Sequence, residues 1–239
     1  MFQVFRGKDK NIGDVIQVSM VKVLGVDEAG RGPVIGSMFI GGFMAEESDL
    51  EKVEELGVKD SKKLSNVKRD SIDEVLENYG DTFLKEVEAS EIDELREIMS
   101  INEIELQAFV DVIERADPDK VFVDLPEPDG DRFIRKMKKE LPRRFQDIEF
   151  VAEHEADDTY PIVSAASIVA KSARERHIKR LQEKYGYDFK SGYPHDKPTI
   201  KFLERFVEEK GELPPETRKS WSTAERILKE NSQSGLEDF

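Results

Sequence analysis

The sequence contains no cysteine and only three histidines among its 239 residues. The absence of cysteine excludes disulfides, thiolate metal sites and a cysteine nucleophile. So few histidines also disfavour a zinc site built from several imidazoles. Any metal that the chain binds is therefore expected to be held mainly by the carboxylates of Asp and Glu.

Long apolar runs are missing as well. No stretch approaches the ~18 apolar residues that a membrane-spanning helix requires. Residues 1–19 lack the basic start and the following apolar segment that are typical of a secretory signal. We therefore expect a cytoplasmic protein that has no membrane partner.

Negative charge prevails, since the formal net charge is −15. A general nucleic-acid coat protein would be basic, so that class is disfavoured, while an enzyme with one local basic groove is compatible with the charge. Segment 171–201 has nine Lys or Arg against four Asp or Glu, and segment 132–144 has seven against one. Each segment fits a solvated helix face, but in so acidic a chain they indicate that a polyanion docks there.

Strand and helix patterns alternate along the chain without internal repeats, which is typical of an α/β domain with a mixed sheet and a helical C-terminal part. The division predicted is an N-terminal extension at 1–20, a catalytic domain at 21–185, a C-terminal helical substrate-binding part at 186–230 and a flexible tail at 231–239. Strands are predicted at 21–26, 34–44, 82–87, 120–124 and 148–152. Helices are predicted at 50–56, 66–79, 102–116, 128–140, 161–184, 198–209 and 223–230.

Acidic residues stand where the predicted strands end. Asp27 and Glu28 close the first strand, Asp124 closes the fourth, and Asp157 and Asp158 precede the long helix that begins at 161. Carboxylates crowded at one sheet edge repel one another, and hard divalent cations with oxygen ligands relieve that repulsion. Acids before a helix also serve as simple caps, which is the competing explanation for the last two. We expect a carboxylate metal site, because two such ions can activate water against a phosphodiester.

Six segments, in order, resemble those of type 2 ribonucleases H, the ribonuclease HII family, in its archaeal branch. The similarity spans roughly residues 20 to 227, and so many ordered motifs are far more specific than a single short pattern. The segments are VDEAGRGP at 26–33, DSKKLS at 60–65, VD at 123–124, the stretch from AD at 156–157 to YPIVSAASIVAK at 160–171, SGYP at 191–194 and RKSW at 218–221.

The resemblance implies a ribonuclease H-like fold, with a mixed central β-sheet flanked by helices and a helical C-terminal part. It also implies that Asp27, Glu28, Asp124 and Asp157 are both the catalytic residues and the ligands of a two-metal site for Mg²⁺ or Mn²⁺. Asp158 matches no catalytic position.

The resemblance further implies a set of substrate-binding residues. The glycine-rich segment would read the 2′-hydroxyl of the ribonucleotide, a tyrosine would pack on the sugar that follows, and three lysines would contact phosphates. Glycines allow backbone amides to approach a strand, although a tight turn alone would also explain them. The residues are Gly30, Arg31, Gly32, Lys62, Lys63, Lys171 and Tyr193.

The function implied is an endoribonuclease that cleaves the RNA strand of RNA–DNA hybrids and cuts at ribonucleotides embedded in duplex DNA. The products would carry 3′-hydroxyl and 5′-phosphate ends, and the protein would work as a monomer. A nuclease restricted to hybrids, a catalytically inactive hybrid-binding module and an acidic interaction protein are the alternatives. The last seven residues resemble a sliding-clamp-binding box through Gln233, Leu236 and Phe239, although such a pattern also arises by chance at a chain end.

Overall fold

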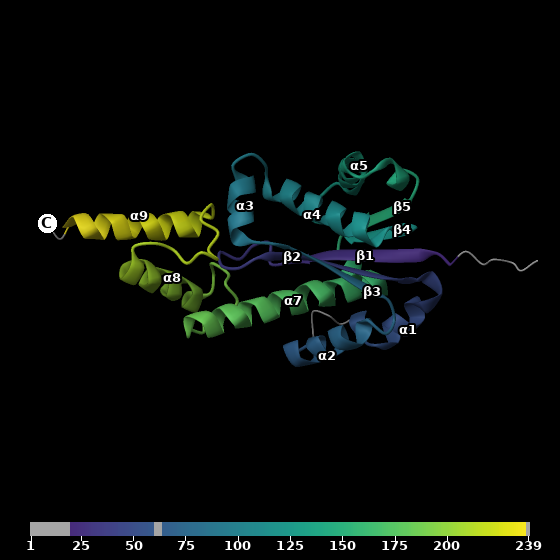
Figure 1. Cartoon of the computed structure of the whole chain (residues 1–239), viewed down its shortest axis with the longest axis horizontal. Coiled ribbons are helices and arrows are strands. Elements are labelled where there is room, and N and C mark those ends of the chain that lie inside the picture. Colours follow the sequence, from purple (N-terminus) through teal and green to yellow (C-terminus); the bar gives the residue numbers. More distant parts are fainter. Residues whose placement is uncertain (1–19, 60–63, 238–239) are drawn as a thin grey trace, which may run out of the picture.

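The computed structural model describes residues 20–59 and 64–237 and contains a five-stranded sheet in the order β3-β2-β1-β4-β5 (Figure 1). Strand β1 pairs antiparallel with β2 and parallel with β4; β3 continues the antiparallel half and β5 the parallel half. This arrangement confirms the mixed sheet. The strands are β1 (Lys22–Ala29), β2 (Met38–Glu46), β3 (Asp81–Val87), β4 (Lys120–Asp124) and β5 (Glu149–Glu153).

Helices cover both faces of the sheet, as Figure 1 shows. One face carries α3 (Ala89–Arg96), α4 (Ile101–Ala116) and α5 (Gly130–Glu140). The other carries α7 (Pro161–Tyr185), against whose outer side α1 (Leu50–Glu55) and α2 (Asn66–Leu76) pack. Each face of the sheet packs against its own apolar core, so the sheet is buried on both sides.

Helix α7 lies unusually close to the two central strands. A Cβ atom at Gly25 of β1 would stand 2.1 Å from the carbonyl oxygen of Ile162, and one at Gly41 of β2 would stand 2.4 Å from that of Ala166. Only glycine allows this approach. It places the start of α7 against the middle of β1, while the short helix α6 (Ala156–Thr159) before it contacts β4.

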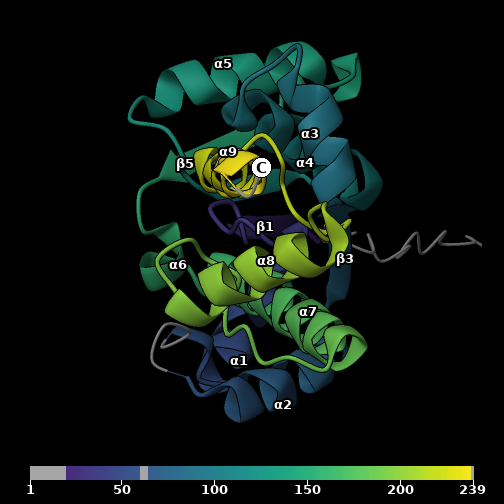
Figure 2. The ribbon, with the colours of Figure 1, turned by 90° about the vertical axis from the view of Figure 1, so that its left-hand side faces the viewer.

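The C-terminal part consists of α8 (Lys197–Lys210) and α9 (Ser222–Glu237), which lie together at one end of the molecule (Figures 1 and 2). Its core joins Phe189, Phe202 and Leu203 to Val34 and Ile35 of the loop between β1 and β2. The C-terminal part is therefore anchored on the loop that carries the glycine-rich segment.

The structure differs from the sequence-based expectation in several elements: β2 begins at Met38 instead of residue 34, α6 was not expected, and the helices α3 and α9 differ most. The pattern gave no signal for α3, whose few apolar residues are spread among acids. Helix α9 continues to Glu237, whereas the expected helix ends at residue 230 and a flexible tail follows. The added turns lack a local sequence signal, because they contain Asn231, two serines and Gly235, which favour helices weakly. The Arg226–Glu230 pair, with 2.8 Å between its charged atoms, stabilises the turn before them.

Some of the predicted segments and residues cannot be compared with the structure. Residues 1–19 of the extension predicted at 1–20, the lysines at 62 and 63, and Phe239 lie outside the described residues. None of the helices in the described part combines the length and the apolarity needed to cross a membrane.

Candidate active site

The parallel pairing of β1 and β4 brings the first acids together. Val26 is in register with Val123, so that Asp27 and Asp124 follow at the same edge of the sheet. Asp27 is only 3% exposed, and its Oδ1 accepts a hydrogen bond of 2.7 Å from the backbone N–H of Glu28. The sheet thus places the carboxylates of Asp27 and Asp124 on neighbouring strands, toward the carboxyl ends of β1 and β4.

The other two predicted acids are connected to this edge by α6 and α7. The backbone N–H of Ala156 donates to Asp124 at 3.0 Å. Asp157, the next residue, is 2% exposed and lies 3.7 Å from the Nζ of Lys171 on α7. The structure thus gathers all four predicted acids around one edge, with Lys171 facing both Asp157 and Asp27.

Burial and mutual repulsion raise the pKa of two of these acids, Asp27 and Glu28. Burial, reinforced by the charge of Glu28, raises the pKa of Asp27 to about 8. Burial, reinforced by Glu105, raises the pKa of Glu28 to about 7. Both shifts report an uncompensated cost of holding negative charge at this edge.

The donor chemistry suits a hard divalent cation, which prefers oxygen ligands and would offset the repulsion between Asp27 and Glu28. As the side chains stand in residues 20–59 and 64–237, however, no three Asp, Glu or His groups are close enough together to hold a metal ion. The edge therefore offers suitable ligands without a preformed cluster of three.

Glu105 is an acid of this region that the sequence reasoning missed. It belongs to α4, is completely buried, and places a carboxylate oxygen 3.5 Å from the Nε of Arg31. Burial raises its pKa to about 7. A signal was available, because Glu105 falls on the apolar face of an amphipathic helix, between Ile101 and Ala108. An acid at a core position is costly and calls for a specific reason.

The glycine-rich segment lies beside the acids and borders a pocket of about 290 Å³. Its Arg31 points toward α4, where its Nη2 donates to the Oδ1 of Asn102 at 2.5 Å. Arg69 and Arg174 also line the pocket and were not foreseen. The full lining is Glu28, Ala29, Gly30, Arg31, Arg69, Lys171, Arg174, Glu175 and Tyr193. The pocket therefore contains four cations and two acids, a net positive charge beside the carboxylates.

Tyr193 closes this pocket from the C-terminal side. The guanidinium of Arg174 lies 5.1 Å from the centre of its ring, within cation–π range. A Cβ at Gly32 would stand 3.2 Å from the Cε1 of Tyr193, so the glycine leaves room for the ring. The structure thus brings Tyr193 next to the glycine-rich segment, as the resemblance implies.

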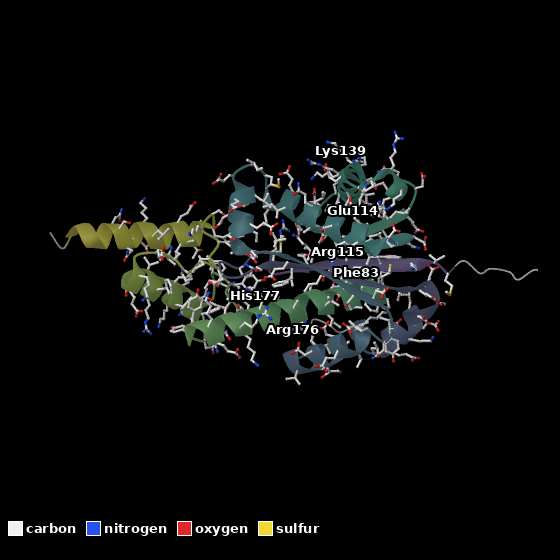
Figure 3. All side chains as sticks on the ribbon, viewed as in Figure 1. Phe83, Glu114, Arg115, Lys139, Arg176 and His177 are labelled. Atoms are coloured by element: carbon white, nitrogen blue, oxygen red, sulfur yellow. The ribbon has the colours of Figure 1, made fainter. Side chains whose placement is uncertain are left out.

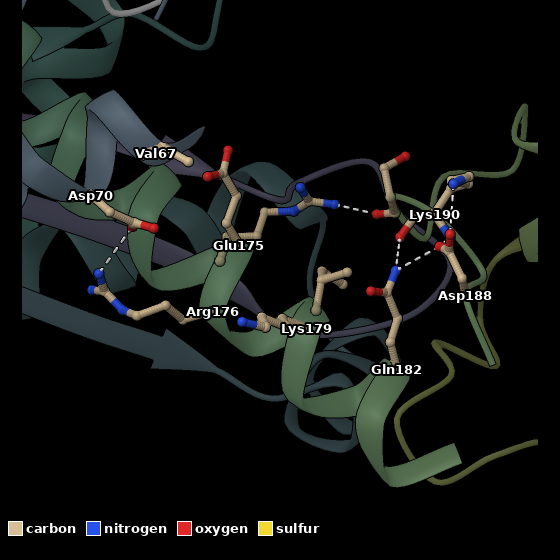
Figure 4. Close-up of a pocket in the computed structure, with 11 residues that line it drawn as sticks. Val67, Asp70, Glu175, Arg176, Lys179, Gln182, Asp188 and Lys190 are labelled. Carbon is tan, nitrogen blue, oxygen red and sulfur yellow. Dashed lines mark hydrogen bonds and ion pairs between the residues drawn. The ribbon is translucent and has the colours of Figure 1, made fainter. Parts of the chain in front are cut away.

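A second groove, of about 640 Å³, adjoins the pocket across Arg174 and Glu175 and follows α7 (Figure 4). Most of its charges are matched locally. Arg176, which projects from α7 (Figure 3), lies 2.8 Å from Asp73, and Lys190 lies 2.6 Å from Asp188. The basic character of segment 171–201 is therefore partly neutralised, and its cationic side chains at the acids matter more than its total charge.

The mixed sheet, with acids at the carboxyl ends of β1 and β4 and with helices on both faces, defines the class. The chain has a ribonuclease H-like fold.

Comparisons with known proteins refine this class. The family model described as Ribonuclease HII matches residues 24–224. The Ribonuclease HII of Methanothrix thermoacetophila is 43% identical, over 87% of this chain and 98% of the relative. The chain belongs to the ribonuclease HII family and is a ribonuclease H endonuclease.

Two solved structures show the same fold. The ribonuclease H2 of Pyrococcus horikoshii OT3 superposes with a TM-score of 0.83 at 41% identity, over 89% of this chain and 99% of that one. The ribonuclease HII in a PCNA:RNase HII complex from Archaeoglobus fulgidus superposes with a TM-score of 0.78 at 37% identity, over 91% of this chain and 100% of that one.

Proposed function

We propose that this chain hydrolyses the RNA strand of RNA–DNA hybrids and also cuts at single ribonucleotides embedded in duplex DNA, in the cytoplasm. The products carry 3′-hydroxyl and 5′-phosphate ends. One observation supports the proposal above all: Glu28, Gly30 and Arg31 border the same pocket, which Tyr193 closes. Groups suited to hydrolysis and groups suited to reading a sugar therefore meet at one place.

The four acids Asp27, Glu28, Asp124 and Asp157 would hold two Mg²⁺ or Mn²⁺ ions. Such ions supply an activated water and stabilise the leaving oxygen of the phosphodiester. The family membership, the oxygen-only donor set and the raised pKa values of Asp27 and Glu28, which positive charge would offset, support this assignment.

The remaining residues of the pocket bind and orient the strand. Lys171 and Arg31 offer positive charge to the phosphates on either side of the cleaved bond. Tyr193 offers an apolar ring face to the sugar, and the backbone of the glycine-rich segment offers amide donors to the 2′-hydroxyl. This hydroxyl is the chemical difference between ribose and deoxyribose at a given site.

A sliding clamp is the proposed protein partner. One structural neighbour, 37% identical, is described in a complex with PCNA. The proposed contact is the C-terminal Q-x-x-L-x-x-F pattern at Gln233, Leu236 and Phe239. Gln233 lies exposed in the last turns of α9, where a partner can reach it.

A single cleavage assay tests the proposal. The substrate is a DNA duplex that contains one ribonucleotide, incubated with Mg²⁺ and, in parallel, with EDTA; an all-DNA duplex and a continuous RNA–DNA hybrid complete the set. We expect cleavage of the two ribonucleotide-containing substrates, dependent on the metal. Cleavage of the hybrid alone would support the nuclease restricted to hybrids, and binding without cleavage would support the inactive binding module.

A further inference from the structure

Arg218 is completely buried, although it is a charged residue in the segment between α8 and α9. A buried guanidinium is tolerated only when its donors are satisfied. The carbonyl oxygens of three residues accept from it: Gly30 at 2.5 Å, Arg31 at 2.7 Å and Gly36 at 2.9 Å. All three belong to the loop between β1 and β2, about 180 positions earlier in the sequence.

These contacts determine the direction of the amides in the glycine-rich segment. In a trans peptide unit, the C=O and the following N–H point in opposite directions. Because Arg218 draws the carbonyls of Gly30 and Arg31 toward itself, the N–H groups of Arg31 and Gly32 face away from it. Among the described residues, neither of these two N–H groups has a hydrogen-bond acceptor. They are therefore available to donate to a bound ligand.

The surrounding segment fixes this arrangement. The backbone N–H of Arg218 donates to Val34 at 2.9 Å, and that of Gly36 donates to Glu216 at 2.8 Å. The ring N–H of Trp221 donates to the carbonyl of Gly32 at 3.3 Å. The loop is thus held along its length by residues 216–221, and Arg218 supplies the contacts at its centre.

We infer that Arg218 is a positioning residue, which aims the amides of Arg31 and Gly32 at an oxygen of the ribonucleotide. The inference rests on the proposed function, because it assigns to these amides the reading of ribose. A charged donor on each carbonyl also polarises the peptide and strengthens the opposite N–H as a donor. The C-terminal part therefore contributes to recognition from beneath the loop, through a residue that never touches substrate.

The test measures how much more tightly the protein binds a duplex with one ribonucleotide than the same duplex made of DNA, and it does not depend on cleavage. Full-length protein carrying Asp27→Asn, which removes cleavage, is titrated with a duplex containing one ribonucleotide and with the same duplex made of DNA. Arg218→Lys keeps the positive charge but loses the fork that spans two carbonyls. We expect the ribonucleotide preference to fall about tenfold, as for the loss of one or two hydrogen bonds, while affinity for the DNA duplex stays the same. Arg226→Lys, on the exposed side of α9, is the matched control.

An unchanged preference in a folded Arg218→Lys protein would overturn the inference and leave Arg218 as a purely structural clamp. Should that variant not fold, Trp221→Phe provides a milder change: it removes the hydrogen bond to Gly32 and trims the ring whose centre lies 4.9 Å from the Arg218 guanidinium, which loosens Arg218. We expect the preference to fall about twofold, and an unchanged preference would contradict the inference. Amide ¹⁵N resonances of Arg31 and Gly32 in the two variants report the orientation directly. They stay informative even if the unaltered protein shows no ribonucleotide preference, an outcome that would instead contradict the proposed function.

Discussion

The Nε of Arg31 lies 3.5 Å from the carboxylate of Glu105, and this carboxylate is completely buried. One turn earlier on α4, Asn102 accepts a hydrogen bond from the same guanidinium at 2.5 Å. Helix α4 thus supports Arg31 from the side opposite the substrate pocket. The pair joins a predicted phosphate-binding residue to an acid that also repels Glu28.

Glu105→Gln keeps the size of the side chain and removes its charge. Two effects are expected. Loss of the ion pair loosens Arg31, so KM for a ribonucleotide-containing duplex rises roughly threefold to tenfold while kcat changes less. Loss of the repulsion with Glu28 raises the melting temperature of the metal-free protein. Steady-state kinetics and thermal unfolding measure both, with Glu114→Gln on the same helix as control. An unchanged KM would show that Arg31 does not depend on Glu105.

Asp27→Asn and Asp124→Asn are expected to abolish cleavage while the protein stays folded and still binds hybrids. Each removes one of the acids to which the metals are assigned. In the absence of metal, the folded protein keeps the Asp27 proton up to about pH 8, whereas the unfolded chain releases it near 3.8. Stability therefore falls as pH rises through this window, and Asp27→Asn removes the loss.

Denaturant unfolding in EDTA at pH 5 and pH 8 measures this difference, together with cleavage in Mg²⁺. Near-normal turnover by a folded Asp27→Asn protein would refute the assignment of the site. Asp158→Asn, at an exposed neighbouring acid without a predicted role, is expected to cleave normally.

His177 on α7 (Figure 3) provides a second pH dependence, of opposite sign. Its Nε2 accepts the backbone N–H of Ser37 at 3.3 Å, and its Nδ1 lies 3.3 Å from Glu86. Burial lowers the pKa of His177 below its ordinary value of 6.5, against the opposing pull of Glu86. The unfolded chain therefore binds a proton that the folded protein resists, and stability is lost as pH falls below about 6.5.

His177→Gln is expected to flatten that part of the stability profile. Denaturant unfolding between pH 8 and pH 5.5 measures it, and His195→Gln, an exposed histidine, should leave the slope unaltered. Equal slopes for His177→Gln and the unaltered protein would contradict the burial argument.

Tyr193→Ala is expected to reduce cleavage at a single ribonucleotide about tenfold or more, with a smaller effect on general duplex binding, because a base or sugar loses an aromatic partner worth about 1–3 kcal/mol. Tyr193→Phe keeps the ring against Arg174 and Gly32 and should retain most of the activity. Comparing kcat/KM on the single-ribonucleotide duplex and on the hybrid separates the two effects. Equal losses on both substrates would place junction reading elsewhere.

The sequence was informative where patterns are local. The apolar run before Asp27 and the run 121–123 before Asp124 predict buried strands, and the sheet confirms them. The end of α9 was not predictable in the same way, since polar residues such as Lys229 and Asn231 carry little periodic signal. Helix α3 was not predicted for a similar reason, because Ile92 is the one large side chain of this helix that is buried.

The site features that the sequence did not predict depend on contacts between residues far apart in the sequence. Arg218 belongs to a motif of the resemblance, but its burial under Gly30 and Arg31 depends on how the C-terminal part folds back. Glu105 gave a local warning, as an acid on an apolar helix face, yet its partner Arg31 lies 74 positions away. Local pattern can show that such a residue is anomalous; only the tertiary fold supplies the partner.

Deleting residues 233–239 is expected to leave metal-dependent cleavage unaltered and to abolish binding to the organism's sliding clamp. The deletion removes the whole Q-x-x-L-x-x-F pattern and ends the chain within α9, beyond the buried Ala224 and Ile227 that hold this helix to the C-terminal core. Calorimetric titration of the clamp with the full-length and shortened proteins measures the difference, and the triple substitution of Gln233, Leu236 and Phe239 by Ala tests the pattern without shortening the chain. Equal affinity of the full-length and shortened proteins would show that the clamp, if bound, contacts another surface.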